Sequence, residues 1–162
     1  MMRNLSSIIK PKRLIAEATL TATPSAVVIN RASTNSRVWE ALQFAFHVGA
    51  GGITFDATNY LALKLEDSDN GSTYANVTAA AAVVFGAENP AGTNFAQAPD
   101  ANGLVRLINA AHASADSDPF RVDYVGSKQY VRASIVFGGT HATGTLVGLW
   151  AVLGYPNIAP VV

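Results

Sequence analysis

The sequence of 162 residues contains no cysteine, which excludes a disulfide framework and any thiol chemistry. It is also poor in charge. Asp, Glu, Lys and Arg make up only 14% of the residues, against about a quarter in typical soluble domains. The 11 basic and 11 acidic residues cancel to a net charge of zero, so a lone monomer would have little colloidal protection. We therefore expect other protein to cover much of the surface.

Long hydrophobic runs are missing as well. No segment approaches the ~18 consecutive apolar residues that a membrane-spanning helix needs. The C-terminal stretch TLVGLWAVLGYPNIAPVV comes nearest, but Gly148, Gly154 and Pro156 interrupt it. The N-terminal stretch has no run of signal-peptide length, because the basic residues and proline at 10–13 break it. We expect a soluble product made in the cytoplasm, with no membrane partner.

The familiar catalytic motifs are absent from the sequence. It has no G-x-S-x-G elbow, no Walker loop and no dinucleotide fingerprint. The histidines, His47, His112 and His141, are dispersed without the clustered spacing of a zinc site. We therefore predict that the protein is not an enzyme and binds no cofactor or metal.

One acidic stretch, around Asp67, Asp69 and Asn70, raises the question of calcium, because hard cations bind clustered oxygens. An EF-hand needs glycine at loop position six and glutamate at position twelve. Counted from Asp67, Gly71 is at position five and Thr78 is at position twelve. A polar hairpin tip is the better interpretation, and the Asn-Gly pair favours a type I′ turn there.

Strand patterns dominate the rest of the chain. Apolar and polar residues alternate over 38–48 and again over 61–66, with the period of two that a half-buried strand requires. The stretch 146–153 is apolar on both faces, as expected of a central strand or of one covered by a neighbouring subunit. The segment 104–118 is compatible with either a helix or a strand. The fold class is therefore all-β, an antiparallel β-sandwich of jelly-roll type.

The most regular segment, Phe120 to Phe137, predicts a hairpin closed by a type II′ turn at Gly126-Ser127. This register gathers one apolar face, comprising Phe120, Val122, Val131, Ala133, Ile135 and Phe137. It also gathers one polar face, comprising Arg121, Asp123, Lys128, Tyr130, Arg132 and Ser134. The polar face is a candidate for an intermolecular salt-bridge surface, with a solvated outer face as the alternative. Its basic and aromatic residues also suit nucleic acid, which the zero net charge disfavours.

The two ends of the chain differ in charge from the middle. Residues 1–13 include Lys10, Lys12 and Arg13 and no acidic residue, which suggests a basic arm that lies on an acidic partner surface; a frayed, solvated terminus is the alternative. Residues 14–155 would form the sandwich, and 156–162 an extended tail containing Pro156 and Ile158. We expect both ends to reach neighbouring proteins.

Three stretches of the sequence suggest a family. The stretch YVGSKQYVRASIVFGGTHATGT, the tail AVLGYPNIAPV and the upstream LKLEDSDNGSTYANV resemble the jelly-roll decoration or cement proteins of tailed bacteriophages. The resemblance covers about Leu61 to Val162, and Gln129 departs from it where a basic residue is expected. It implies a non-enzymatic protein on the virion exterior. As a dimer or trimer, such a protein would bind the major capsid protein at subunit junctions and resist internal DNA pressure.

Three other functions remain open. The same features fit a component of the phage tail or baseplate. A carbohydrate-binding β-sandwich would need surface aromatics, whereas Trp39 and Trp150 both lie in apolar stretches typical of a core. A small hydrolase would need a cleft with perturbed carboxylates, and eleven dispersed acidic residues identify no particular pair.

Overall fold

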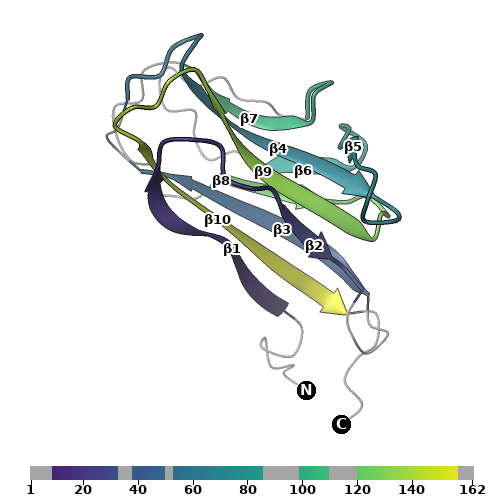
Figure 1. Cartoon of the computed structure of the whole chain (residues 1–162). Helices are drawn as coiled ribbons and strands as arrows, with labels where there is room; N and C mark the ends of the chain where they lie inside the picture. Colours follow the sequence, from purple (N-terminus) through teal and green to yellow (C-terminus); the bar gives the residue numbers. More distant parts are fainter. Residues whose placement is uncertain (1–8, 33–37, 50–52, 86–98, 110–119, 157–162) are drawn as a thin grey trace.

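The computed structural model describes residues 9–32, 38–49, 53–85, 99–109 and 120–156. These residues form two antiparallel sheets packed as a sandwich (Figure 1). Sheet A has the order β1 (Ile9–Leu20), β10 (Thr145–Pro156), β3 (Trp39–Val48), β8 (Phe120–Tyr124) and β6 (Ala82–Phe85). Sheet B has the order β2 (Val27–Asn30), β9 (Tyr130–Gly138), β4 (Tyr60–Ser68) and β5 (Ala75–Asn76), and β7 (Leu104–Ile108) also pairs with β4.

The predicted all-β antiparallel sandwich is confirmed, and the strand arrangement is compatible with a jelly roll. The part of the chain that the structure describes contains no helix, and hence none that could cross a membrane. The segment 104–118, for which the sequence left two possibilities, forms a strand over Leu104–Ile108; residues 110–118 lie outside the described ones.

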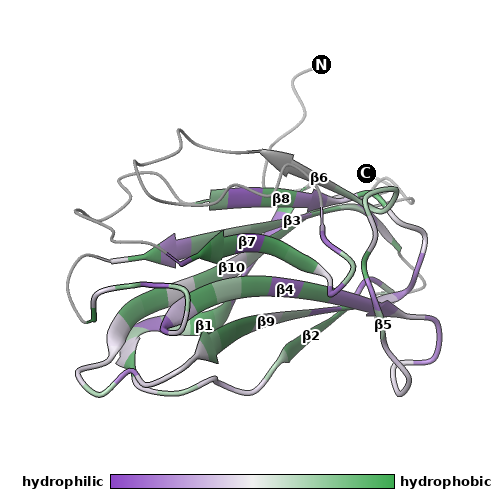
Figure 2. Ribbon diagram, turned by 90° about the horizontal axis from the view of Figure 1, so that it is seen from above, coloured by the Kyte–Doolittle hydropathy of each residue, from purple (hydrophilic) through white to green (hydrophobic). Residues whose placement is uncertain are grey.

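The core lies between the two sheets and follows from the alternation in the sequence. On β3 every second side chain is buried, from Leu42 through Phe44 and Phe46 to Val48. These pack with buried residues of sheet B such as Leu63 in one hydrophobic cluster. Figure 2 shows hydrophobic residues along the strands of both layers. Because burying each such side chain contributes roughly 1.5–3 kcal/mol, the pattern specifies which face of each strand turns inward.

Strand β10 is central in sheet A, as its apolar sequence predicts. It pairs with β1 on one side and β3 on the other. Its inward residues, including Leu149 and Ala151, are fully buried, while Leu146, Trp150 and Val152 on the outer face are half-buried. Strand β10 is therefore apolar on both sides, because one side faces the core and the other forms an apolar part of the outer face of sheet A.

The predicted hairpin at 120–137 is wrong. Strand β8 pairs with β3 and β6 in sheet A, whereas β9 pairs with β2 and β4 in sheet B. The intervening residues therefore cross from one sheet to the other. Gly126 also lacks the positive φ that a type II′ turn requires. The predicted inward residues are nevertheless buried, since two strands that face each other across a core alternate in the same way as two that pair side by side.

Arg31 stabilises this crossing. Its side chain is almost fully buried and donates hydrogen bonds from Nη1 to the carbonyl oxygens of Gly126 (2.8 Å) and Lys128 (3.1 Å). Its Nε and Nη2 donate to the carbonyls of Trp39 and Glu40. The Arg31 guanidinium thus links the crossing segment to the start of β3. A buried guanidinium requires hydrogen-bond acceptors for its N–H groups, and these carbonyl oxygens supply them.

The predicted hairpin after β4 exists, but its turn differs from the expected one. Glu66 pairs with Asn76 and Asp67 with Ala75, so the loop is longer than a two-residue type I′ turn. Gly71 has a φ of 71°. Asn70 instead accepts hydrogen bonds from the backbone of residues 72 and 73 through its side chain, which is the usual local role of Asn in turns.

Strand β1 runs through the predicted boundary between residues 13 and 14. Residues 9–13 pair with β10, so they belong to the sandwich as its edge strand, and residues 1–8 lie outside the described part. At the other end, β10 includes Pro156, which pairs with Trp39. The rest of the predicted tail, residues 157–162, is not among the described residues.

Candidate interaction surface

The polar residues that the sequence assigned to one face lie on opposite sides of the molecule. Arg121 and Asp123 are on the outer face of sheet A, since they pair with Ala45 and Gln43 of β3. Tyr130 and Arg132 are on the outer face of sheet B. The structure therefore separates the predicted salt-bridge surface into two halves, each of which has its own surroundings.

The outer face of sheet B carries a closed network of charges. Glu66 lies between Lys64, at 3.1 Å from its Nζ, and Arg132, at 2.7 Å from its Nη2. The Arg132 guanidinium also lies 4.2 Å from the centre of the Tyr74 ring, a cation–π geometry. Both cations are thus paired with Glu66 within the chain, so this face has partners for its charges without a second protein.

The same network determines the protonation of Glu66, whose side chain is only 12% exposed. Burial opposes its ionisation, but hydrogen bonds from Arg132 and Lys64 outweigh this effect. The pKa of Glu66 therefore lies below its ordinary value.

The carboxylates of the acidic hairpin tip each contact side chains of this protein. Glu66 binds the two cations above, Asp67 accepts a hydrogen bond from the Tyr124 hydroxyl at 2.8 Å, and Asp69 pairs with Lys128. Each carboxylate thus has a separate partner. Within the described ranges there is no group of three or more metal-ligating side chains.

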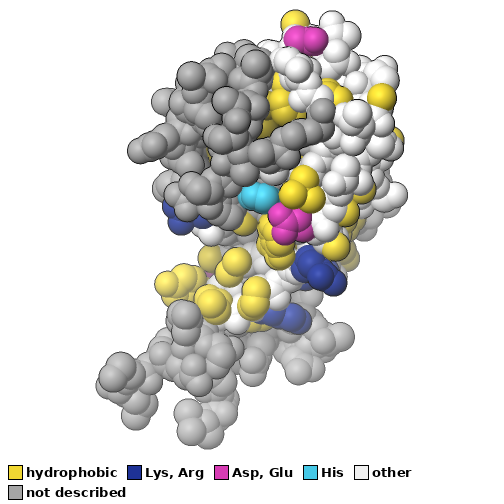
Figure 3. Space-filling model, turned by 90° about the vertical axis from the view of Figure 1, so that its left-hand side faces the viewer, with side chains coloured by type: hydrophobic (Ala, Val, Ile, Leu, Met, Phe, Trp, Pro, Cys, Tyr) yellow, Lys and Arg dark blue, Asp and Glu magenta, His cyan; other side chains and the backbone are white. Residues whose placement is uncertain are grey.

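The outer face of sheet A has a different character. Residues that pair across β1, β10, β3 and β8 share this side of the sheet, and we call them the sheet A face. They form four rows: Ile9–Gly154–Ala41, then Pro11–Val152–Gln43–Asp123, then Arg13–Trp150–Ala45–Arg121, and then Gly148–His47, where His47 Nδ1 lies 3.1 Å from Glu17 Oε1 of β1. Most are apolar or small. Figure 3, which views the molecule from the β1 and β10 side, shows hydrophobic side chains gathered with Lys and Arg at their margin.

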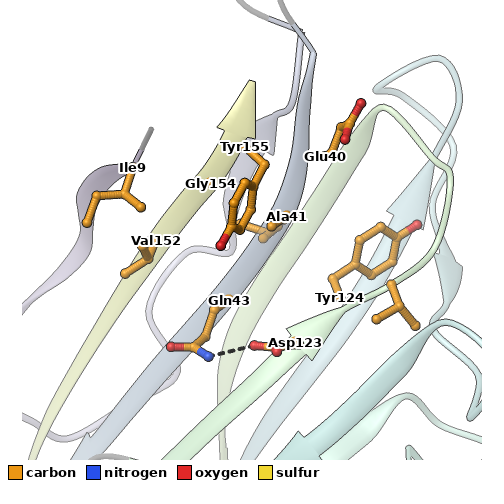
Figure 4. A pocket seen from close by; sticks show the side chains of 11 residues that line it. Ile9, Glu40, Ala41, Gln43, Asp123, Tyr124, Val152, Gly154 and Tyr155 are labelled. Atoms are coloured by element: carbon orange, nitrogen blue, oxygen red, sulfur yellow. Dashed lines mark hydrogen bonds between the residues drawn. The ribbon is translucent and has the colours of Figure 1, made fainter. Parts of the chain in front are cut away.

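A shallow depression of about 450 Å³ lies at one end of the sheet A face (Figure 4). Its apolar wall includes Ile9 and Val152, together with Val125 and Tyr155, whose residues are 57% and 63% exposed. Gly154 leaves the middle of the depression free of a side chain. Exposure of two large hydrophobic residues at one depression is the kind of feature that marks interaction sites.

The polar side of the depression is acidic. Gln43 donates a hydrogen bond from Nε2 to Asp123 Oδ1 at 2.6 Å (Figure 4). Glu40 also lines the depression, and no Lys or Arg does so among the residues described. The site therefore offers an apolar surface with two carboxylates and one amide at its border.

Tyr155 has an unusual backbone, with a φ of 51°. A non-glycine residue in this region costs roughly 1–2 kcal/mol relative to the extended conformation. The pairing of Pro156 with Trp39 holds the strand end in place, and the Tyr155 ring lies beside Gly154 and Ala41 (Figure 4). Strain of this kind is more common at functional positions than elsewhere.

Trp150 corrects a second expectation. It is half-buried on the outer face of sheet A and lies over Gly148, where an added Cβ would come within 2.7 Å of the indole. Trp39 does pack against the core as expected. One of the two tryptophans is therefore a surface aromatic, which the alternation could not reveal because the outer face of β10 is apolar too.

The residues that the sequence singled out therefore have several locations. Arg13, Arg121 and Asp123 belong to the sheet A face, whereas Tyr130 and Arg132 belong to sheet B. Lys10 and Lys12 are exposed on β1 and point to the other side of sheet A, with Leu153 and Ala151. Pro156 ends β10, and Ile158 lies outside the described residues. Sequence reasoning missed Ile9, Val125 and Tyr155, for which no pattern gave a signal.

Comparison of the chain with protein-family models, with curated proteins and with solved structures returned no match.

Proposed function

We propose that the chain is a non-enzymatic structural protein of a virion, which decorates the capsid exterior by binding the major capsid protein as a dimer or trimer. The observation that carries this proposal is the contrast between an apolar sheet A face and a sheet B face whose charges are paired internally. Interfaces that persist are depleted in charge at their centre and enriched in aromatic residues. Trp150, Tyr155 and Val152 give the sheet A face that composition.

The resemblance to jelly-roll decoration proteins supports the same assignment, because its motifs fall on the parts that form the surface. The tail motif AVLGYP covers the end of β10, where Gly154 and Tyr155 border the depression. The YVGSKQYVR motif covers the crossing between the sheets, where Val125 is exposed. The resembling residues are thus surface residues as well as core residues.

Shell binding by two matched variants tests the proposal. Val125 on the sheet A side is 57% exposed, and Ala75 on β5, the sheet B strand furthest from β2, is exposed as well. We expect Val125→Asp to weaken binding to shells that lack the protein by about tenfold or more, because burying an unpaired charge in an apolar contact costs about 1.4 kcal/mol or more. Ala75→Asp, on the far edge of sheet B, should change it by less than about twofold, the scale of a non-contacting surface change.

The measurement is co-sedimentation of the purified protein with shells from which it is absent, after its oligomeric state has been determined by light scattering. A monomer that ignores such shells would refute the decoration role. A reconstruction of the particle in which the protein occupies the tail or baseplate would support the structurally similar alternative instead.

A second candidate function, carbohydrate binding, is favoured by one observation. Trp150 and Tyr155 are aromatic side chains on the same face of sheet A, and Asp123, Gln43 and Glu40 line the neighbouring depression. Aromatic rings beside carboxylates and amides could stack on a sugar and bond its hydroxyls. Glycan-array binding that is abolished by Trp150→Ala would favour this function over shell decoration.

A further inference from the structure

A second groove lies at the open side of the sandwich, between the edge strands β1 and β2. Its volume is about 360 Å³. Ile29, Trp39 and Leu153 contribute apolar surface, while Lys10 and Lys12 contribute the charged rim. Lys10 pairs with Leu153 and Lys12 with Ala151, so both lysines point to the core side of sheet A although they are exposed.

The groove exists because the two sheets have edge strands of unequal length. β1 has 12 residues and β2 has four. Sheet A therefore continues past the edge of sheet B, as Figure 1 shows for β1 and β10 beside β2. The inward side of β1 near its start therefore faces β2 only across the groove, which Ile29 and Asn30 line from the other side.

The edge of β2 is suited to pairing with another extended chain. Arg31 donates its backbone N–H to the carbonyl of Gln129 in the register that continues the β2–β9 pairing. Because hydrogen-bonded and non-hydrogen-bonded pairs alternate in antiparallel ladders, Val28 and Asn30 direct their backbone groups away from β9. These groups form an edge of the kind to which peptides add as an extra strand.

The charge of the groove restricts what such a strand can be. Both charged residues that line it are lysines, and among its described lining residues there is no carboxylate. A segment with apolar side chains towards Trp39 and carboxylates towards Lys10 and Lys12 would complement both features, since charge complementarity selects partners and register.

We infer that this groove binds an extended, carboxylate-bearing segment of the partner protein, which adds to the edge of β2. The inference rests on the proposed function only in that the partner is the shell protein. It is separate from the sheet A face, because the groove opens on the opposite side of β10. The alternative is that inward-pointing lysines merely protect the edge from aggregation.

The test uses the full chain and two capped hexapeptides, one alternating Val and Glu and the other alternating Val and Lys. Binding is measured by the fluorescence of Trp39 in a Trp150→Phe background and by hydrogen exchange at the amides of Val28 and Asn30. We expect the Glu peptide to bind at least about tenfold more tightly than the Lys peptide and to protect both amides, as strand addition requires. Equal affinities, or no saturable binding of either peptide, would overturn the inference.

A matched charge reversal tests the role of the lysines. The double variant Lys10→Glu/Lys12→Glu should reverse the preference to the Lys peptide. Arg13→Glu is the control, because Arg13 is on the same strand but pairs with Trp150 on the opposite face. An equal effect of Arg13→Glu would mean that only the overall charge matters and would reject the groove.

Two further outcomes would also reject it. If the Glu peptide binds only after deletion of residues 1–8, the chain's own N-terminal segment is the occupant. If light scattering shows that the Glu peptide dissociates an oligomer, the occupant is a second copy. Because the titration needs no shells, its failure would leave the Val125→Asp test unaffected, and failure of that test would not change the peptide preference.

Discussion

The strands of both sheets alternate between buried and outward-facing side chains, yet the outward-facing side chains of the two sheets differ in polarity and charge. On sheet B, Lys64, Glu66 and Arg132 satisfy one another and Arg132 covers Tyr74. On sheet A, the equivalent positions of the central strand are Val152 and Trp150. An internally paired face is stable in water, whereas an apolar face in a chain of low charge gains from being covered.

The difference shows that the surface of this sandwich is specialised by side. Charges are few in the chain, and the described structure uses several of them in pairs on sheet B and at the hairpin tip. The sheet A face has Arg13, Arg121 and Asp123 at its border, around an apolar middle. We therefore expect substitutions on sheet B to affect stability and those on sheet A to affect binding.

The largest effect on stability should come from Arg132→Ala. It removes the partner of a mostly buried carboxylate and uncovers Tyr74. Lys64 still binds Glu66 in this variant, but loss of the hydrogen bond from Arg132 to a charged group costs roughly 1.5–3 kcal/mol. We therefore expect a loss of about 2 kcal/mol in the free energy of unfolding, measured by urea denaturation.

Arg121→Ala is the matched control, since Arg121 is an exposed arginine on the outer face of sheet A. Its loss should change the free energy of unfolding by less than about 0.5 kcal/mol, the usual range for surface substitutions. Similar effects of the two arginines would contradict the specialisation of the two faces.

The next effect, on sheet A, concerns the backbone of Tyr155. Both Tyr155→Ala and Tyr155→Gly remove the ring, but only glycine is at ease with a φ of 51°. We expect the glycine variant to be more stable than the alanine variant by about 1 kcal/mol, although glycine is normally the less stable of the two in a strand. Thermal unfolding of both variants measures the difference, and a more stable alanine variant would contradict the observed φ.

Shell binding should weaken equally in the two Tyr155 variants. The ring borders the depression of the sheet A face, and neither replacement restores it. If shell binding falls in step with stability instead, Tyr155 acts through the fold and the surface role of its ring is wrong.

Strands β8 and β9 show which parts of the fold the sequence predicts. Alternation identified the inward residues Val122 and Val131 correctly, because burial of one side of a strand is a local property. It could not identify the partner strand, since pairing side by side and facing across a core bury the same residues. The crossing depends on Arg31, some 95 residues away from Gly126, and no short-range pattern contains that contact.

The candidate surface was predictable only in part for a related reason. The sequence identifies the lysines at the start of β1 as candidate surface residues because they are charged in a chain with few charges. Tyr155 and Val125 did not, because an exposed hydrophobic residue differs from a buried one only in where the fold places it. Trp150 shows the same limit, since its apolar neighbours in sequence suggested a core position.

The smallest expected effect concerns sheet B and is a change in how the stability of the fold depends on pH. The pKa of Glu66 in the folded protein lies below its ordinary value of 4.5. The folded state therefore releases this proton more readily than the unfolded state. The resulting stability is fully present above pH 4.5 and is lost as the pH falls through the lower, folded-state pKa.

Glu66→Gln should remove this part of the acid sensitivity. The amide cannot titrate, so the free energy of unfolding of the variant should fall less steeply than that of the wild type between neutral pH and the acid range. At neutral pH the variant should be less stable than the wild type, because Arg132 and Lys64 lose an anionic acceptor. Glu40→Gln, at an exposed glutamate outside this network, should retain the wild-type slope. Parallel pH profiles of the wild type and Glu66→Gln would show that the sheet B network does not stabilise the fold, and the contrast between the two faces would then rest on sheet A alone.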